Sequence, residues 1–559
     1  NGELVPLVDL QGKFIDNLKI IGGKYVKNEY YNEDQKPEKS VDVEICIHLK
    51  EKNRAFKVEK YIHSYPNCWR TDKPILYYPL DSWFIGVSKI RDKLVSLNKQ
   101  INWIPSSTGE KRFSNWLSSA NDWNLSRSRY WGIPLPIWRT KDNCETKVIG
   151  SVNELKSEII KSINNKHMEF NPIESFEVDN MGEENYDNID LHKDTLDNII
   201  LSSDEGKPMY RENDLIDVWF DSGAMPYAQV HYPFENKNLI DEKKIFPADY
   251  IAEGVDQTRG WFYTLHVIST IVFNSISYKN VISNGLVLDK NGQKMSKRLG
   301  NSIDPFEIIS KYGPDATRWY MISNSNPWDN LRFDIDGVDE ISRKFFGTLF
   351  NTYSFFVLYA NIDEFDVNKK NIPITKRPEI DRWIISELNR LIKEVDEAFD
   401  KYDATKAARN ISTFVNDLLS NWYVRLSRRR FWKGEYNNDK ISAYQTLYEC
   451  LSSISKVISP IAPFYSDYIF QCINTVTKKE DYESVHLSEF PSSNEDLINL
   501  ELEKKINQVR NICSLALSIR KKEKLKVRQP LKKIIIPVKD KNEKNDIENA
   551  KAQILSEIN

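Results

Sequence analysis

The sequence predicts an α/β domain followed by an α-helical bundle, with a small β-rich segment at the amino end. Three observations lead to this order. Short apolar runs alternate with turns up to about residue 62. Strand-like and helical segments alternate after residue 211, which is typical of a parallel sheet covered by helices. From about residue 350, apolar residues recur at helical spacing over long segments, which indicates a bundle.

Length and composition limit the number of domains and the class of protein. With 559 residues the chain has room for three or four domains, and 40% hydrophobic with 28% charged residues is typical of globular proteins. Because 78 basic residues face 81 acidic ones, net charge does not predict nucleic-acid binding, and local basic clusters have to be judged individually. No stretch has the length of a membrane span, and the amino end does not resemble a signal peptide. We therefore expect a cytoplasmic protein without a membrane partner.

The six cysteines are scattered and never occur as Cys-x-x-Cys. This distribution favours a reducing compartment and argues against a disulfide framework. The seven histidines show no His-x-x-His spacing, so we expect no catalytic zinc helix.

Residues 1–62 are interpreted as β-rich, with a strand at Val41–Ile47 where apolar and polar residues alternate. An aromatic hinge, His63–Arg70, follows. At about 139–211 the composition turns polar, which we interpret as an insertion on the surface of the preceding domain.

Two strand ends stand out in the α/β part. One predicted strand ends in a Ser222-Gly223 turn, and Asp249–Ala252 forms another that leads through Glu253-Gly254 into an apolar helix. That helix is marked by residues in helical step: Phe262, Leu265, Ile268, Ile271 and Val272. Farther along, Asp304-Pro305-Phe306-Glu307 has the capping acid, proline and glutamate of a helix start.

Three bundle helices follow from periodicity. Their apolar positions are Ile384, Leu388, Leu391, Val395 and Ala398; Ala404, Ala407, Ile411, Val415, Leu418 and Trp422; and Tyr444, Leu447, Leu451, Ile454 and Ile458. Pro460 ends the third helix. After Ser492 the chain is rich in Lys and Glu and mostly helical, and it breaks at Pro530 before an apolar strand at Ile534–Ile536.

The turn after the Asp249–Ala252 strand carries candidate ligand-binding residues. Glu253 and Gln257 are four apart and, in a helix, would project to the same side. A carboxylate there suits a substrate ammonium group, and Gly254 allows a ligand to approach the backbone. The alternative is an ordinary helix start, where acidic residues are favoured by the helix dipole.

A second candidate is Lys294-Met295-Ser296-Lys297-Arg298, which follows an Asn-Gly turn signal. Ammonium groups on flexible stems can follow charge as it develops on a polyphosphate. The alternative is a solvated charged turn, which is common in a lysine-rich chain.

Two aromatic features complete the set. Trp219 and Trp261 are interpreted as flat walls of an apolar pocket, with two core tryptophans as the alternative. Arginines and a tryptophan at the end of the second bundle helix suit single-stranded RNA, although a helix carboxyl end favours basic residues in any case. They are Arg425, Arg428, Arg429, Arg430 and Trp432. The basic run 520–528 has the same two interpretations.

In this combination and order, the motifs resemble the class I aminoacyl-tRNA synthetases, and within them the isoleucine-specific branch. Lys294–Arg298 looks like the family's KMSKS loop, with Arg298 in the last place. The run Asp217–Asn236 looks specific to the isoleucine branch. Further matching runs are Trp123–Pro134, Gly313–Arg318, Ala462–Phe464 and Val527–Leu531, so the resemblance spans nearly the whole chain.

The resemblance implies ATP-dependent activation of L-isoleucine to an adenylate, with Mg²⁺, and transfer to the 3′ end of tRNA(Ile). Glu253, Gly254, Asp256 and Gln257 would hold the adenylate, while Trp219 and Trp261 would line the side-chain pocket. Lys294, Ser296 and Lys297 would stabilise the phosphates, and the arginine cluster would contact tRNA. A monomer is expected.

The resemblance also implies a domain order. Residues 1–62 would be the end of an editing domain, and 63–345 the second part of a Rossmann-type catalytic domain with its insertion at about 139–211. Residues 346–492 would form a helical anticodon-binding domain, and 493–559 the start of a C-terminal helical junction region.

Two departures from the family pattern affect these expectations. No two histidines have the His-x-Gly-His spacing of the other family motif, so we expect a C-terminal portion of a longer enzyme that is inactive alone. Relatives can bind zinc near the positions of Cys68 and Cys144, but Thr71 replaces a second thiolate and Cys144 is solitary, so no structural zinc is expected. A valine-specific relative and a non-catalytic tRNA-binding protein derived from a synthetase remain the alternatives.

Overall fold

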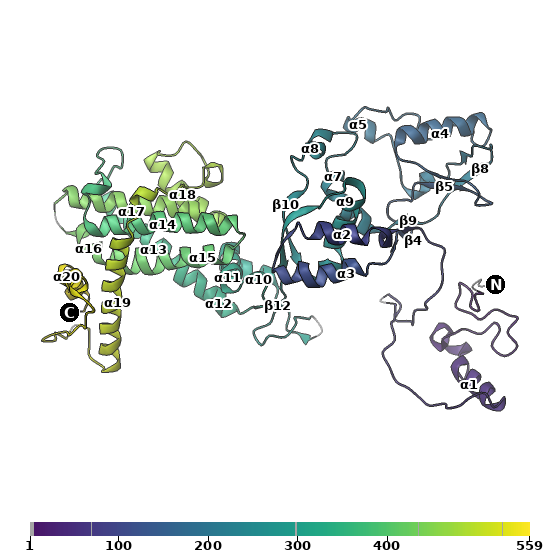
Figure 1. The fold of residues 1–559 in the computed structure, drawn as a ribbon, viewed down its shortest axis with the longest axis horizontal. Helices are drawn as coiled ribbons and strands as arrows, with labels where there is room; N and C mark the ends of the chain where they lie inside the picture. The colour runs from purple at the N-terminus through teal and green to yellow at the C-terminus, as the bar shows by residue number, and fades with distance from the viewer. Residues whose placement is uncertain (1–4, 69, 297–298, 434, 528, 559) are drawn as a thin grey trace. The chain divides into compact units, whose positions relative to one another are not determined.

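The computed structural model describes residues 5–68, 70–296, 299–433, 435–527 and 529–558. The chain divides into two compact units, one formed by Asn1–Lys89 with Asn121–Asp221 and one by Ile90–Ala120 with Ser222–Asn559. Each unit is described by itself (Figure 1). Within the described ranges, no helix combines the length and apolar character needed to cross a membrane.

The first unit contains a four-stranded antiparallel sheet in the order β6-β5-β8-β7. Its strands are β5 (Ile137–Thr140), β6 (Thr146–Val148), β7 (Leu201–Ser202) and β8 (Pro208–Arg211). The helix α4 (Val152–Asn164) packs on this sheet, as Figure 1 shows, and Ser151 caps it by accepting a hydrogen bond from the Glu154 N–H. Two one-turn helices, α5 (Glu183–Tyr186) and α6 (Lys193–Leu196), lie between α4 and β7 along the chain.

The predicted polar insertion has a hydrophobic core of its own. The buried members are Trp138, Ile149, Leu155, Ile159, Ile173, Leu196, Ile199, Leu201 and Met209. Because a small sheet with one covering helix buries few side chains, the rest of its sequence stays polar.

Two short antiparallel pairs complete the sheets of the first unit: β1 (Phe84–Ile85) with β3 (Trp123–Asn124), and β4 (Ser126–Arg127) with β9 (Leu215–Ile216). The strand prediction for Val41–Ile47 is wrong, because these residues begin the helix α1 (Val41–Glu51). Acidic residues in its first turn and basic residues in its last turn interact favourably with the helix dipole and stabilise this helix. The described β-structure of residues 5–62 consists of the isolated bridges Val8↔Phe14 and Lys13↔Tyr25.

A parallel three-stranded sheet in the order β10-β11-β2 forms the centre of the α/β part of the second unit. Its strands are β2 (Asn102–Ile104), β10 (Ala248–Gly254) and β11 (Tyr278–Asn284). The predicted helix α9 (Trp261–Phe273) connects β10 to β11. It buries Phe262, Leu265 and Ile268, whereas the other two predicted apolar positions, Ile271 and Val272, are exposed. Two shorter helices, α2 (Arg91–Asn98) and α3 (Ser114–Ser118), belong to the same part.

The expected strand ending in the Ser222-Gly223 turn is a helix, α7 (Val218–Ala228). Gly223 allows α7 to approach α9 closely, because a Cβ on Gly223 would lie 2.8 Å from Ile268 Cδ1. A short helix, α8 (Lys237–Asp241), follows. The helix–helix contact, which the local pattern does not contain, explains the glycine that we had assigned to a turn.

A short parallel pair, β12 (Val287–Leu288) and β13 (Leu331–Arg332), comes next. Two helices, α10 (Pro305–Tyr312) and α11 (Pro314–Asn324), lie between these strands in sequence, and α12 (Ile335–Ile341) follows β13. The predicted start of α10 is confirmed, since Asp304 Oδ1 accepts a hydrogen bond of 2.8 Å from the Phe306 N–H.

The bundle prediction is also confirmed. Its helices are α13 (Gly347–Ile362), α14 (Glu379–Asp400), α15 (Ala404–Thr413), α16 (Arg425–Trp432), α17 (Asn438–Val457) and α18 (Pro463–Thr477). A π-helical stretch, Phe414–Val424, joins α15 to α16. The predicted apolar positions of α14 and α17, including Ile384, Leu388 and Leu451, are buried in one core that runs from Ile308 to Ile558.

The carboxyl end is helical, with α19 (Leu500–Lys522), α20 (Lys541–Asn549) and α21 (Lys551–Ile558). The predicted strand at Ile534–Ile536 is wrong. These residues have no strand partner among those the structure describes, and Ile535 is exposed. An apolar run becomes a strand only when a neighbouring strand satisfies its backbone groups.

Candidate active site

The two predicted ligand-binding motifs leave the same edge of the parallel sheet. Glu253 and Gly254 at the end of β10 lie opposite Ser283 and Asn284 at the end of β11. Beyond β10 the chain enters the turn Val255–Arg259 and then α9, whereas beyond β11 it enters β12 and the Lys294 loop. Ligands of parallel α/β sheets bind outside the carboxyl ends of the strands, which is where both motifs begin.

Contacts within the turn after β10 account for the glycine, aspartate and glutamine of its sequence. A Cβ on Gly254 would lie 2.5 Å from Asp256 Oδ1, so any other residue here would displace this carboxylate. Gln257 uses both ends of its side chain: Nε2 donates to Asp256 Oδ2 (3.1 Å), and Oε1 accepts from the Trp261 N–H (2.8 Å). Gln257 therefore orients Asp256 and satisfies one free N–H at the start of α9.

Glu253 and Gln257 do not share a helix face as expected, because Glu253 still belongs to β10. Glu253 is exposed, and within the described ranges its carboxylate has no hydrogen-bond or ion-pair partner. Asp256 is exposed as well. The sheet edge thus presents two exposed carboxylates. Asp256 accepts a hydrogen bond from Gln257, whereas Glu253 has no partner among the described residues.

The two tryptophans belong to different units and are described separately. Trp261, in the second unit, is half-buried, and its indole N–H donates to the Ser222 carbonyl oxygen at 2.9 Å. Trp219, in the first unit, is 41% exposed near the start of α7. Neither is a fully buried core residue.

The Lys294 loop begins with a hairpin. Residues 289–293 form its turn, with Gly292 at a φ of 80°, and Leu288 and Lys294 make an antiparallel bridge. Lys294 is exposed, and its ammonium has no ion-pair partner in the described part of the chain. Met295 packs against the core that includes the bundle, and the Ser296 N–H donates to Asn301 Oδ1.

Some predicted residues lie outside the described residues. These are Lys297 and Arg298 of the loop, Trp69 of the aromatic hinge and Arg528 of the last matching run.

Sequence reasoning missed two acids in the first unit. Asp217 is buried and accepts hydrogen bonds from Trp123 Nε1 (3.0 Å) and from Arg127 (2.6 Å). Burial, and then the nearby Asp217 charge, raises the pKa of half-buried Asp221. In the sequence, these two acids are visible only as a pair four residues apart. The apolar run that contains them is interpreted there as the end of a strand.

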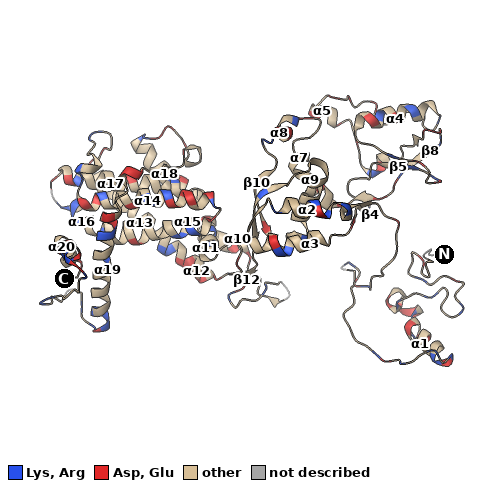
Figure 2. Ribbon diagram, in the orientation of Figure 1, with Lys and Arg blue, Asp and Glu red and all other residues tan. Residues whose placement is uncertain are grey.

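The arginine helix α16 separates into paired and unpaired side chains. Arg430 pairs with fully buried Asp381 (2.7 Å) and with Asp439 (3.0 Å), and Arg425 pairs with Glu557. Arg428 and Arg429 are exposed and have no ion pair with any described residue. Trp432 at the end of the helix is 55% exposed. Figure 2 colours the Lys and Arg positions of the ribbon blue, including those of α16.

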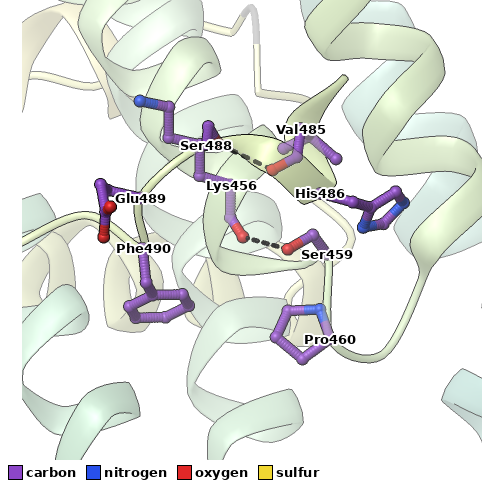
Figure 3. A pocket seen from close by; sticks show the side chains of 8 residues that line it. All are labelled: Lys456, Ser459, Pro460, Val485, His486, Ser488, Glu489 and Phe490. Atoms are coloured by element: carbon purple, nitrogen blue, oxygen red, sulfur yellow. Dashed lines mark hydrogen bonds between the residues drawn. The ribbon is translucent and has the colours of Figure 1, made fainter. Parts of the chain in front are cut away.

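The bundle also contains a cavity of about 310 Å³ (Figure 3). It lies between the end of α17 and the segment after α18, and none of the predicted site residues lines it. Lys456 in its wall is already paired with Glu480 at 2.7 Å. This lysine is therefore not an unpaired cation in the cavity.

Two family models match this chain. The model described as tRNA synthetases class I (I, L, M and V) matches residues 26–334, which include the whole carboxyl edge of the sheet. The chain belongs to the class I tRNA synthetases. A second model, the anticodon-binding domain of tRNA ligase, matches residues 381–536 of this synthetase and includes α16.

Curated relatives of the synthetase include several isoleucine–tRNA ligases. The isoleucine–tRNA ligase of Bacteroides fragilis (strain YCH46) is 57% identical over 576 residues, an alignment that covers 100% of this chain and 50% of the relative. The ligases of Cytophaga hutchinsonii and Porphyromonas gingivalis are 56% and 53% identical, again over 100% of this chain. The chain spans about half the length of the curated relatives it matches.

Proposed function

We propose that this chain is part of an isoleucine–tRNA ligase, which activates L-isoleucine with ATP and transfers it to tRNA(Ile). The single observation that carries the proposal is the shared sheet edge, from which both the Glu253–Gln257 turn and the segment that leads to the Lys294 hairpin begin. Identity of 57% to an isoleucine–tRNA ligase over the full chain supports the choice of amino acid. Such an enzyme would act in the cytoplasm, and we expect a monomer.

In the activation step, a carboxylate oxygen of isoleucine attacks the α-phosphorus of MgATP, and the bond to the departing pyrophosphate breaks. No covalent enzyme intermediate is needed, so catalysis consists of positioning and charge stabilisation. The unpaired carboxylate of Glu253 would bind the substrate ammonium. Asp256, held by Gln257, would accept hydrogen bonds from nucleotide hydroxyls beside Gly254.

Lys294 and Lys297 would stabilise charge on the phosphates as pyrophosphate leaves, and Ser296 would line the same loop. Lys294 has the exposure that this role requires. Trp219 and Trp261 would form walls of the isoleucine pocket, which suits their incomplete burial. In the transfer step, a terminal ribose hydroxyl of tRNA attacks the activated carbonyl and AMP leaves.

For tRNA, the unpaired Arg428 and Arg429 with exposed Trp432 would contact phosphates and bases. Arg425 and Arg430 would act through the structure of the helix, because both are already paired. The proposed domains are the end of an editing domain (1–62), the catalytic part (63–345), the anticodon-binding part (346–492) and the start of a junction region (493–559).

The test is isoleucine-dependent pyrophosphate exchange by the full-length protein. We expect exchange with isoleucine to exceed exchange with valine. Faster exchange with valine would favour a valine-specific relative, and no exchange with either amino acid would favour a non-catalytic tRNA-binding protein.

Lysine substitutions test the loop within the same assay. Lys294→Ala and Lys297→Ala should each lower kcat by about 100-fold with little change in the KM for isoleucine, because they act on charge that develops in the transition state. Lys290→Ala is the matched control, since Lys290 is an exposed lysine of the same hairpin. Unchanged rates for both loop variants would show that the loop is a solvated charged turn without a role in phosphate binding.

A further inference from the structure

One buried carboxylate organises the hairpin that precedes Lys294. Asp289 is 8% exposed, and its Oδ1 accepts hydrogen bonds from the N–H groups of Asn291 (2.9 Å) and Gln293 (2.8 Å). The Asp289 N–H also donates to the Gln293 carbonyl oxygen at 2.9 Å. The Gly292 N–H donates to the Asp289 carbonyl oxygen at 2.9 Å, so four hydrogen bonds tie Asp289 to its own turn.

Asp289 Oδ2 points to the other end of the loop. It accepts a hydrogen bond of 3.0 Å from Nδ2 of Asn301, which lies 12 residues farther along the chain. Side-chain contact between Asp289 and Asn301 thus closes the base of the loop that carries Lys294 and Ser296.

Asn301 holds the loop backbone at two further points. Its Oδ1 accepts from the Ser296 N–H (2.9 Å), and its Nδ2 also lies 3.2 Å from the Lys294 carbonyl oxygen. On its other side, Lys294 is held by the bridge to Leu288. The backbone of Lys294 is therefore held from two directions, whereas its side chain is exposed.

These contacts have an energetic basis. Hydrogen bonds to an ionised carboxylate are roughly twice as strong as neutral ones. The Asn301 hydrogen bond is the largest cause of the lowered pKa of Asp289, so this carboxylate stays ionised at neutral pH. A loop whose base is closed in advance loses less conformational freedom when it binds a ligand.

We propose that Asn301 and Asp289 are positioning residues of the activation reaction, which hold the backbone of Lys294 and Ser296 so that the lysine meets the nucleotide phosphates. Neither side chain touches substrate in this role. The inference rests on the proposed function, because it assigns the task of the loop to phosphate binding.

The test compares Asn301→Ala with Asn291→Ala. Asn291 is the matched control, since its exposed side chain makes no hydrogen bond with any described residue. We expect Asn301→Ala to speed amide hydrogen exchange in peptides that contain Ser296. In pyrophosphate exchange it should lower kcat by about tenfold or more, with the KM for isoleucine nearly unchanged, because a misplaced catalytic group reduces rate rather than amino-acid binding.

A reciprocal exchange of the two side chains separates positioning from general loss of structure. Asn301→Asp places two carboxylates face to face and should be at least as harmful as Asn301→Ala. Combining it with Asp289→Asn restores a carboxamide–carboxylate pair and an acceptor for the Ser296 N–H. The swap does not restore the donor that Asn301 Nδ2 supplies to the Lys294 carbonyl oxygen. The double variant should therefore recover most of the amide protection of Ser296 and only part of the rate.

The outcomes are distinct. An active wild-type protein whose rate and Ser296 exchange are both unaffected by Asn301→Ala would overturn the inference alone. So would a double variant whose Ser296 amide exchanges as fast as in Asn301→Asp. A wild-type protein without isoleucine-dependent exchange would overturn the proposed function and, with it, the catalytic role of the pair, even if Asn301→Ala still changed amide exchange.

Discussion

At the scale of single residues, existing partners decide which predicted site residues are available to a ligand. Glu253 and Lys294 are exposed and unpaired among the described residues, as ligand contacts require. In contrast, both polar atoms of the Gln257 side chain already make hydrogen bonds to nearby residues, to Asp256 and to the Trp261 N–H. Gln257 therefore contributes by orienting Asp256. Residue type and spacing predicted the group of residues, but only the contacts separated binding roles from supporting ones.

His266 in α9 illustrates a residue-scale consequence that is independent of the site. It is fully buried, its Nε2 donates to the Leu94 carbonyl oxygen (2.9 Å), and burial lowers its pKa to about 4. The unfolded chain binds a proton more readily, so stability should be fully present above pH about 6.5 and be lost as pH falls toward 4.

We expect the free energy of unfolding to fall by about 2 kcal/mol between pH 7 and pH 5 from this residue alone. His266→Gln, which keeps a donor for Leu94 but cannot titrate, should remove that part of the fall in urea unfolding experiments. Exposed His63→Gln is the control. An identical pH dependence in His266→Gln and wild type would contradict the assignment.

At the scale of elements, α16 shows how one basic helix serves two purposes. Its buried side is fastened to α14, because Asp381 accepts hydrogen bonds from Arg430 and from Tyr423 just before α16. Its exposed side presents Arg428 and Arg429. Sequence alone could not separate the two sides, because the partner of Arg430 lies 49 residues away along the chain.

Two single substitutions in α16 should therefore affect different properties of the protein. Arg428→Ala should weaken tRNA(Ile) binding several-fold and reduce its salt dependence, because a phosphate contact is lost. Adenylate formation and stability should not change. Filter binding over a range of salt concentrations measures the first effect.

Arg430→Ala is the paired experiment. Removing it leaves Asp381 buried without its cation, so we expect destabilisation by about 3 kcal/mol in thermal or urea unfolding. The assignment is wrong if Arg428→Ala abolishes adenylate formation, or if Arg430→Ala leaves unfolding unchanged.

At the scale of the whole molecule, an aromatic stack lies between the parallel sheet of the second unit and its bundle. Tyr250 of β10 stacks on Tyr402, which follows α14, with ring centroids 4.8 Å apart and an interplanar angle of 20°. Asn280 of β11 donates to the Tyr402 hydroxyl at 3.3 Å. Tyr402 has a φ of 57°, an unusual conformation for a tyrosine that the surrounding contacts have to maintain.

We expect Tyr402→Ala to speed amide hydrogen exchange across β10, because the strand loses its contact with the bundle. Tyr402→Phe keeps the stack but loses the Asn280 hydrogen bond, so its effect should be smaller. Tyr468→Ala, at an exposed tyrosine of α18, should leave β10 unaffected. Equal exchange in β10 for Tyr402→Ala and wild type would show that the stack does not support the strand.

The sequence by itself determined the elements whose pattern is local and strong. The bundle helices α14 and α17, the helix α9 after β10 and the capped start of α10 follow from periodicity and capping, which depend on residues close in the chain. The family followed from motifs in order. The candidate site followed as a set of residues.

Only the tertiary structure decided features that depend on partners distant in sequence. Val41–Ile47 is helical, and Ile534–Ile536 has no described strand beside it, because a strand exists only where another strand accepts its hydrogen bonds. Arg430 became structural through Asp381, and Asn301 became part of the loop base through Asp289. Burial and pairing are properties of the folded neighbourhood, so residue type and spacing cannot supply them.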